Sequence, residues 1–191
     1  NATANVKLEQ YGQTNEGRPL LLSFISSAEN INRLEQIRLN NLRLANLARD
    51  KAAPVEENAP ALVWLSYNVH GNETSSSEAA MMTVWALVDR SNTKTKEWLR
   101  NTVVIIDPCI NPDGRDRYVN WFNSIVGKNM NPSLSAREHR EPWPGGRTNH
   151  YNFDLNRDWA WQTQIESQQR MAKYNQWLPY VHVDFHEQGI N

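Results

Sequence analysis

Four short runs rich in β-branched and aromatic residues constrain the fold of this 191-residue chain most strongly. They lie at residues 18–27, 61–68, 102–110 and 180–187, and polar or proline-containing segments bound each of them. Such runs are typical of β-strands. Three of the four are almost continuously apolar, which is typical of strands buried on both faces of a largely parallel sheet.

Helical patterns between these runs indicate the rest of the architecture. Residues 29–49 carry an apolar stripe with a polar back, and residues 161–176 are predicted to form another helix. Residues 75–89 carry apolar side chains on two faces, so we expect this helix to be buried on most sides. The order of the elements predicts an α/β fold with a mixed, largely parallel sheet flanked by helices.

Residues 111–152 fit no periodic template and are rich in Asn, Pro, Gly and Arg. Long ordered segments of this kind are frequently functional, and the tryptophans and tyrosines here argue against disorder. We therefore expect one domain over residues 1–191, with a long irregular active-site segment at 111–152.

Charge and cysteine content narrow the possible chemistry. The 20 basic residues nearly balance the 21 acidic ones, so no net field favours nucleic acid or an anionic membrane. No apolar segment is long enough to predict a membrane span. Cys109 is the only cysteine, which excludes a disulfide within the chain and leaves His, Asp and Glu as possible metal ligands.

The sequence does not identify a compartment. Its first ten residues lack the basic and apolar regions of a signal peptide. A secreted or periplasmic location is favoured if a leader was removed from the chain.

His70 and Glu73 lie in a polar turn just after the second apolar run. Open α/β sheets bind ligands beyond the carboxyl ends of their strands, so this turn is a candidate metal site. His186 ends the last predicted strand at the same edge of the sheet, whereas His182 lies near the opposite edge. The three residues His70, Glu73 and His186 would form a two-His, one-Glu zinc site with a fourth position for water.

Four further short stretches follow in order: "NPDG" (111–114), "GGR" (145–147), "DLNRDW" (154–159) and "DFHEQG" (184–189). Together with the H-x-x-E turn, this set resembles the zinc carboxypeptidase superfamily typified by carboxypeptidase A. The similarity is closer to the cytosolic-type and bacterial branch and extends over nearly the whole chain. It implies a carboxypeptidase-like fold and one Zn²⁺ ion as cofactor.

The resemblance assigns roles around the metal. His70, Glu73 and His186 match the zinc ligands of the family. Asp154 matches the aspartate that hydrogen-bonds the first ligand histidine, a contact that fixes the tautomer of that histidine.

The resemblance also implies residues that contact the substrate. Asn156 and Arg157 match the pair that binds the C-terminal carboxylate, for which a planar guanidinium is well suited. Arg147 matches the catalytic arginine that stabilises the oxyanion, with Arg140 as the competing candidate.

The general-base glutamate and the substrate-capping tyrosine of the family follow its third zinc ligand, and neither has a counterpart here. Glu187 is a poor replacement, because adjacent strand residues point to opposite faces. We therefore expect this sequence to be the N-terminal portion of one carboxypeptidase catalytic domain. It should be inactive or nearly so without its partner, the missing C-terminal half.

The predicted function is that of a zinc metallocarboxypeptidase acting on a peptide or peptide-like substrate with a free C-terminal carboxylate. Two alternatives stay open: a zinc amidohydrolase of the aspartoacylase-like type, and a non-catalytic module that binds zinc or C-terminal peptides. The stretches "NPDG" and "EGRPL" (16–20) favour the peptidase over the amidohydrolase. A glutamate on a later strand of the parent sequence would favour the enzyme over the binding module.

Overall fold

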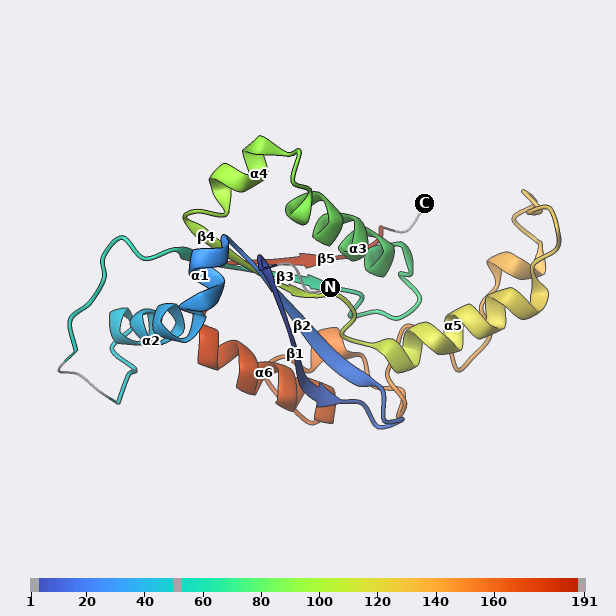
Figure 1. Ribbon diagram of the computed structural model, residues 1–191. Coiled ribbons are helices and arrows are strands. Elements are labelled where there is room, and N and C mark those ends of the chain that lie inside the picture. Colours follow the sequence, from blue (N-terminus) through green and yellow to red (C-terminus); the bar gives the residue numbers. More distant parts are fainter. Residues whose placement is uncertain (1–3, 50–52, 189–191) are drawn as a thin grey trace.

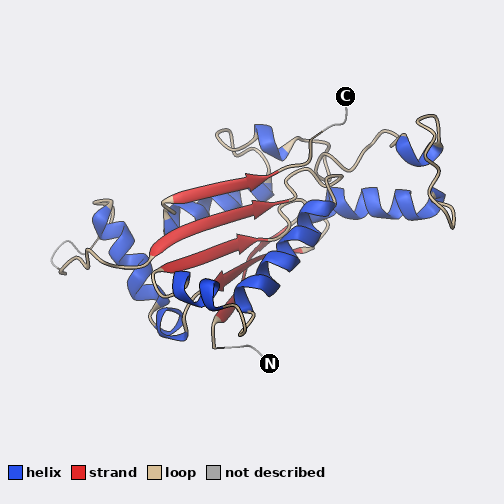
Figure 2. Ribbon diagram, turned by 90° about the horizontal axis from the view of Figure 1, so that it is seen from above, coloured by secondary structure: helices blue, strands red, loops and turns tan. Residues whose placement is uncertain are grey.

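The described residues of the computed structural model, 4–49 and 53–188, form one mixed sheet with the strand order β1-β2-β4-β3-β5 (Figure 2). The strands are β1 (Val6–Gln13), β2 (Pro19–Ile25), β3 (Ala61–Tyr67), β4 (Thr102–Asp107) and β5 (Val181–Phe185). β3 pairs in parallel with β4 and β5, whereas β2 pairs antiparallel with β1 and β4. The carboxyl ends of β3, β4 and β5 therefore meet at one edge of the sheet.

The predicted α/β fold and all four predicted strands are confirmed. β1 was not predicted, because its sequence VKLEQYGQ mixes polar and apolar residues without a buried run. It is an edge strand that pairs only with β2 among the described strands, so most of its side chains need no burial.

Helices cover both faces of the sheet (Figure 1). α2 (Leu34–Leu44), which follows the short α1 (Ala28–Asn32), and α6 (Ile165–Trp177) lie on one face, and α3 (Ser75–Val88) and α4 (Thr93–Trp98) lie on the other. Each face has its own core. The first core is built around Phe24, Trp64 and Trp177, and the second around Tyr67, Ala80 and Ile106.

The prediction that α3 is buried on most sides is wrong. Met81, Met82 and Trp85 are 62%, 65% and 63% exposed, while Ser76 and Ala80 are the buried residues of this helix. α3 packs one apolar face on the sheet, and within residues 4–49 and 53–188 nothing buries the other.

The prediction that residues 111–152 are irregular is wrong for α5 (Pro112–Ile125). Asn111 caps this helix by accepting a hydrogen bond from the Gly114 N–H, and Pro112 suits its first turn because no intrahelical donor is lost there. The glycine, arginines and aspartates of its first two turns interrupt any apolar stripe, which hides the helix in the sequence.

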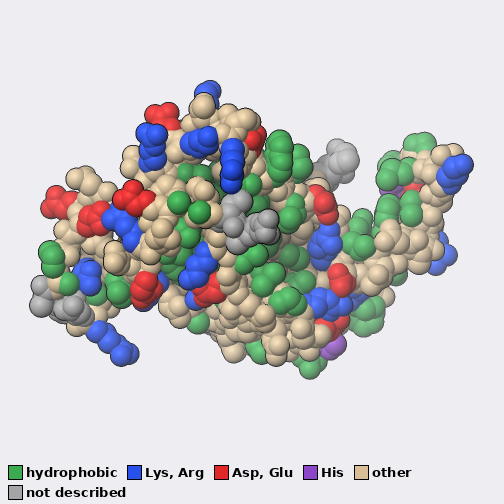
Figure 3. All heavy atoms as spheres, viewed as in Figure 1, with side chains coloured by type: hydrophobic (Ala, Val, Ile, Leu, Met, Phe, Trp, Pro, Cys, Tyr) green, Lys and Arg blue, Asp and Glu red, His purple; other side chains and the backbone are tan. Residues whose placement is uncertain are grey.

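The start of α5 packs on the body of the molecule, and the rest of this helix together with residues 126–144 forms an arm that projects from the body (Figure 1). The arm includes the single turn η1 (Arg137–His139). Apolar side chains gather on its surface (Figure 3), including the exposed Met130, Leu134 and Trp143. None of the helices in the described part of the chain is both long and apolar enough to cross a membrane.

Candidate metal centre

The turn after β3 is held by Asn68, a residue that sequence reasoning did not identify. Asn68 adopts a left-handed backbone conformation with φ of 57° and is fully buried. Its side-chain amide donates to the carbonyl oxygens of His70 at 2.9 Å and of Glu73 at 2.8 Å. Asparagine tolerates this conformation better than most residues, and here its side chain also fixes the turn.

Gly71 allows three segments to meet at this turn. A Cβ at Gly71 would overlap the backbone nitrogen of Arg115 in α5 and the carbonyl oxygen of Gly146. Gly114 is crowded in the same way, because a Cβ at this position would also overlap the Gly146 carbonyl oxygen. The two glycines let the ligand turn, the start of α5 and the segment before Arg147 pack backbone against backbone.

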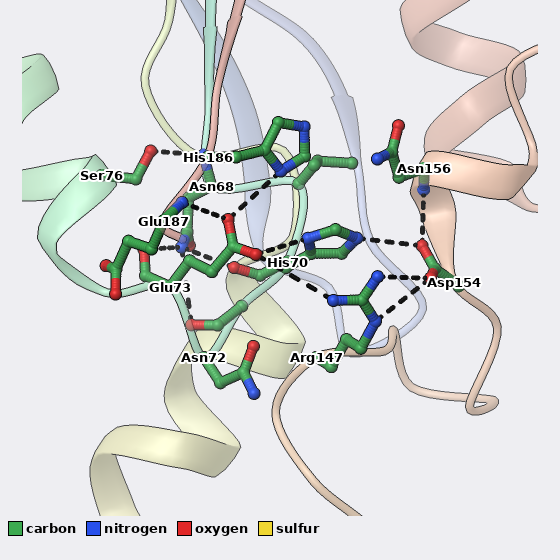
Figure 4. A network of polar contacts seen from close by, with 12 residues as sticks. Asn68, His70, Asn72, Glu73, Ser76, Arg147, Asp154, Asn156, His186 and Glu187 are labelled. Atoms are coloured by element: carbon green, nitrogen blue, oxygen red, sulfur yellow. Dashed lines mark hydrogen bonds and ion pairs between the residues drawn. The ribbon is translucent and has the colours of Figure 1, made fainter. Parts of the chain in front are cut away.

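The structure brings together the three predicted ligands (Figure 4). One ligand atom from each of His70, Glu73 and His186 lies within 4.8 Å of the others. Glu73 is central: its Oε1 is 2.7 Å from Nδ1 of His70, and its Oε2 is 3.2 Å from Nδ1 of His186. Two imidazole nitrogens and one carboxylate oxygen are donors that suit zinc, so the residues present fit this ion.

Asp154 lies behind His70, as the resemblance implied. Its Oδ1 is 3.2 Å from Nε2 of His70 and accepts a hydrogen bond from the Asn156 N–H at 2.9 Å. Burial acts to raise the pKa of Asp154. The Asn156 hydrogen bond and the charges of His70 and Arg147 outweigh it and lower that pKa below its usual value.

Arg147 reaches the same cluster from the other side (Figure 4). Its Nη2 donates to Oδ2 of Asp154 at 3.0 Å, and its Nη1 lies 4.0 Å from Oε1 of Glu73. The Arg147 side chain remains 44% exposed, so it lies at the surface beside the ligands. The competing residue Arg140 is exposed at the end of η1, on the arm.

Asn156 and Arg157 belong to η2 (Leu155–Arg157), a single turn that Asp154 caps. Figure 4 shows Asn156 beside Asp154. Arg157 is exposed, and within residues 4–49 and 53–188 its guanidinium makes one hydrogen bond, a long 3.4 Å contact from Nη1 to the Asn156 carbonyl oxygen. This guanidinium therefore has donors to offer to a ligand.

Glu187 is turned away from the ligand atoms. Its carboxylate accepts hydrogen bonds from the N–H of Ser75 at 2.8 Å and from the Ser75 hydroxyl at 2.5 Å, at the start of α3. Only its backbone N–H reaches the cluster, donating to Oε2 of Glu73 at 3.0 Å. The final residue of the "DFHEQG" stretch, Gly189, lies outside the described residues.

His182 and Cys109 do not belong to the group of ligand residues. His182 bonds Ser66 Oγ through Nε2 at 2.8 Å, packs against the rings of Trp159 and Tyr174, and has a pKa lowered by burial. Burial raises the pKa of the Cys109 thiol to about 12, which makes it a poor nucleophile.

A buried polar cluster that the sequence did not reveal lies deeper, formed by Asp107, Tyr11 and Arg170. The Tyr11 hydroxyl donates to Oδ2 of Asp107 at 3.0 Å, and the Arg170 guanidinium carbon lies 3.4 Å from the centre of the Trp159 ring. Burial raises the pKa of Asp107 to about 7, although the Arg170 charge and the Tyr11 hydrogen bond act against it. Burial also disfavours the charged form of Arg170, which for a base means that its pKa is lowered.

Comparison with solved structures finds the same fold in bacterial carboxypeptidases. A putative carboxypeptidase A from Shewanella denitrificans OS-217 aligns with a TM-score of 0.60 at 19% identity, covering 96% of this chain and 35% of that one. A metallo-carboxypeptidase from Burkholderia cenocepacia gives 0.62 at 16% identity, with 96% and 36% covered. The chain thus spans about a third of the length of these proteins.

A third match is a metallo-carboxypeptidase from Pseudomonas aeruginosa solved with (2-guanidinoethylmercapto)succinic acid. It gives a TM-score of 0.58 at 15% identity, with 95% of this chain and 35% of that one covered. No curated protein matches the sequence. The sequence model of the family described as zinc carboxypeptidase matches residues 2–178, which include His70 and Glu73 and stop before His186. Since this match spans most of the sequence, the chain belongs to the zinc carboxypeptidase family.

Proposed function

We propose that this chain is the zinc-binding portion of a metallocarboxypeptidase that removes C-terminal residues from peptides. One observation carries the proposal: His70, Glu73 and His186, from loops after two neighbouring parallel strands, offer ligand atoms within 4.8 Å of one another. Zinc bound there supplies a Lewis acid that activates water and polarises a peptide carbonyl.

Side chains around the ligands support this chemistry. Asp154 is hydrogen-bonded to Nε2 of His70, which keeps Nδ1 of that ring directed at Glu73. Arg147 presents an exposed guanidinium 4.0 Å from Glu73. We propose that this guanidinium stabilises the negative charge that develops on the substrate carbonyl oxygen.

Asn156 and Arg157 are the proposed anchor for the terminal carboxylate of the substrate. The exposed guanidinium of Arg157 can form two parallel hydrogen bonds with a carboxylate. Both residues follow Asp154 directly, so they are tied to the loop that supports His70. Anchoring the terminal carboxylate beside the metal would restrict cleavage to the last peptide bond.

The general base is proposed to come from residues other than those of this chain. Glu187 is the carboxylate that follows the third ligand, and its oxygen is engaged by Ser75. The short share of the related structures that the chain covers, 35% of the Shewanella protein, is consistent with further residues completing the site. We therefore expect the separate chain to bind zinc but to hydrolyse peptides only at near-background rates.

The family match and the structure bear differently on the two alternative functions, an aspartoacylase-like amidohydrolase and a non-catalytic binding module. The zinc carboxypeptidase match favours a peptidase over an aspartoacylase-like amidohydrolase. A module that binds zinc or peptides without cleaving them is favoured by the engaged carboxylate of Glu187. If the chain belongs to a peptidase, adding the remainder of the domain in trans would supply a catalytic carboxylate and restore hydrolysis. If the chain is a binding module, the same addition would not produce hydrolysis.

Metal analysis tests the proposal directly. The purified chain should bind one zinc ion, measured by elemental analysis and by competition with a chromogenic chelator. His186→Ala should weaken zinc binding strongly because one of three ligands is lost. His139→Ala is the matched control, since the His139 side chain is exposed on the arm and bonds the Asn131 carbonyl oxygen there. Wild-type protein without zinc, or equal affinity for both variants, would refute the proposal.

A further inference from the structure

Asp184 makes a contact with the third ligand that the sequence did not assign. Its Oδ2 lies 3.0 Å from Nε2 of His186. The two residues are two positions apart at the end of β5, so the strand period places them on the same face of the sheet. The contact is partly shielded, with the Asp184 side chain 23% exposed.

The two ligand histidines are held in the same way. His70 directs Nδ1 at Oε1 of Glu73 and Nε2 at Asp154. His186 directs Nδ1 at Oε2 of Glu73 and Nε2 at Asp184. Each imidazole thus has the shared glutamate on one side and its own carboxylate on the other.

Both nitrogens of each ring face a carboxylate, so the metal ion would decide between the two tautomers: zinc bound at Nδ1 would leave the ring hydrogen on Nε2, where Asp154 or Asp184 accepts it. A neutral imidazole carries one N–H, and a carboxylate accepts that hydrogen but offers none. With the hydrogen on Nε2, the lone pair of Nδ1 is free to bind a metal ion. We infer that Asp184 is a positioning residue that fixes the orientation and the Nε2–H tautomer of His186, as Asp154 does for His70. The inference rests on the zinc site proposed above.

The Oδ2 contact is the side-chain hydrogen bond that Asp184 makes among the described residues. Its other oxygen, Oδ1, is buried and has no hydrogen-bond partner there. The carboxylate is therefore committed to the imidazole of His186.

Zinc affinity is the first test. Asp184→Ala should weaken zinc binding by roughly 10–100-fold in chelator competition, because the ring of His186 loses the group that orients it. Asp184→Asn should weaken binding as well, because its amide can turn its N–H₂ group to Nε2 and favour the wrong tautomer. Asp89→Ala is the control: the Asp89 side chain accepts hydrogen bonds from Ser91 at the end of α3 opposite the ligand turn, so the zinc affinity of this variant should match the wild type. Circular dichroism of each variant checks that the chain is folded.

Nitrogen NMR of the metal-free protein provides a readout that does not need zinc. At alkaline pH, long-range ¹H–¹⁵N spectra should show the Nε2–H tautomer of His186 in the wild type, where Asp184 competes with Glu73 for the hydrogen of the ring. Asp184→Ala should shift His186 toward the Nδ1–H tautomer, because the carboxylate of Glu73 then has no competitor. If Asp184→Ala fails to fold, the wild-type tautomer and the near-isosteric Asp184→Asn still decide the question.

The outcomes separate the two proposals. Wild-type affinity in Asp184→Ala, with zinc bound by the wild type, would overturn the role of Asp184 and leave the zinc site standing. A wild type that binds no zinc would refute the zinc site, while a tautomer of His186 that is the same in the metal-free wild type and in the Asp184 variants would overturn the role of Asp184 by itself.

Discussion

The imidazole ring of His186 lies with its centre 4.9 Å from that of His70, although the two histidines follow different strands. The reason is the pairing of β3 with β5, which places Tyr67 opposite Phe185 in parallel register. Parallel neighbours end at the same edge of the sheet, so the loops that follow them start side by side. A metal site at this edge draws its ligands from both loops.

Asp154→Asn should weaken zinc binding by roughly 10–100-fold, because an amide can also present its N–H₂ group to His70 and favour the wrong tautomer. Chelator competition measures the change. Asp116→Asn is a suitable control, since Asp116 pairs with Arg18 away from the ligands. An unchanged affinity for Asp154→Asn would contradict the orienting role assigned to this carboxylate.

Arg147→Ala should lower kcat by roughly 10²–10³ with a small effect on KM, if its guanidinium stabilises the oxyanion. The assay requires a form of the protein that hydrolyses peptides. Arg140→Ala should retain near wild-type kcat, as expected of an exposed arginine on the arm. Since Arg147 also bonds Asp154, zinc affinity is measured in parallel to separate the two effects. A change in KM alone would assign Arg147 to substrate binding.

Arg157→Ala should weaken binding of a peptide with a free C-terminal carboxylate by roughly 10–100-fold, the usual effect of losing a charged hydrogen bond. Calorimetric titration of the zinc-loaded chain measures it. The same peptide with an amidated C-terminus is the control ligand, and its weaker binding should not change in the variant. Equal losses for both peptides would argue against recognition of the carboxylate.

Gly71→Ala should destabilise the protein and disturb the ligand turn. Its new methyl group would overlap backbone atoms of Arg115 and Gly146, and overpacking against backbone costs about 1–3 kcal/mol or more. Thermal unfolding and zinc affinity should both fall. Gly127→Ala is the matched control on the arm, where the added methyl would meet its nearest neighbour, the Asn129 carbonyl oxygen, at an ordinary 3.5 Å. Similar behaviour of the two variants would contradict the close approach at Gly71.

Asp107 should make stability depend on pH. Its pKa in the folded protein is about 7, whereas an unfolded aspartate titrates near about 3.9. The folded state therefore binds this proton more tightly, so the free energy of unfolding falls as pH rises from about 4 to about 7 and levels off above. Asp107→Asn keeps an acceptor for Tyr11 and should flatten this part of the pH profile.

Urea unfolding of metal-free protein across that pH range measures the effect. Asp89→Asn provides the comparison, because hydrogen bonds from Ser91 lower the pKa of Asp89 and move its contribution below this window. Its profile should keep the wild-type slope. Parallel profiles for wild type and Asp107→Asn would show that the buried carboxyl does not titrate in this range.

The sequence predicts the parts of the molecule that local patterns encode. The strands were visible as apolar runs, and the ligands were visible because His70, Glu73 and His186 sit just beyond strand ends. β1 was missed because an edge strand needs few buried residues, and α5 because charged residues break its stripe.

Other features depend on contacts between distant segments. The period of β5 places Asp184 and His186 on one face, so the signal for their contact was present in the sequence. The burial of Arg170 against the Trp159 ring was not visible in the sequence, because it depends on how α6 packs on the sheet. The exposure of one face of α3 could not be predicted for the same reason. The sequence shows that this face is apolar, but the packing of the other elements decides whether it is covered.

The position of β5 sets an order on assembly. His186 reaches the other two ligands only after β5 has joined β3, a pairing between segments far apart along the chain. Pairings of this kind form slowly, because the chain loses the entropy of closing a long loop before the strand contacts stabilise the structure. A newly made polypeptide therefore holds at most two of these ligands until its last described strand docks, and tight metal uptake reports the completion of folding rather than its beginning.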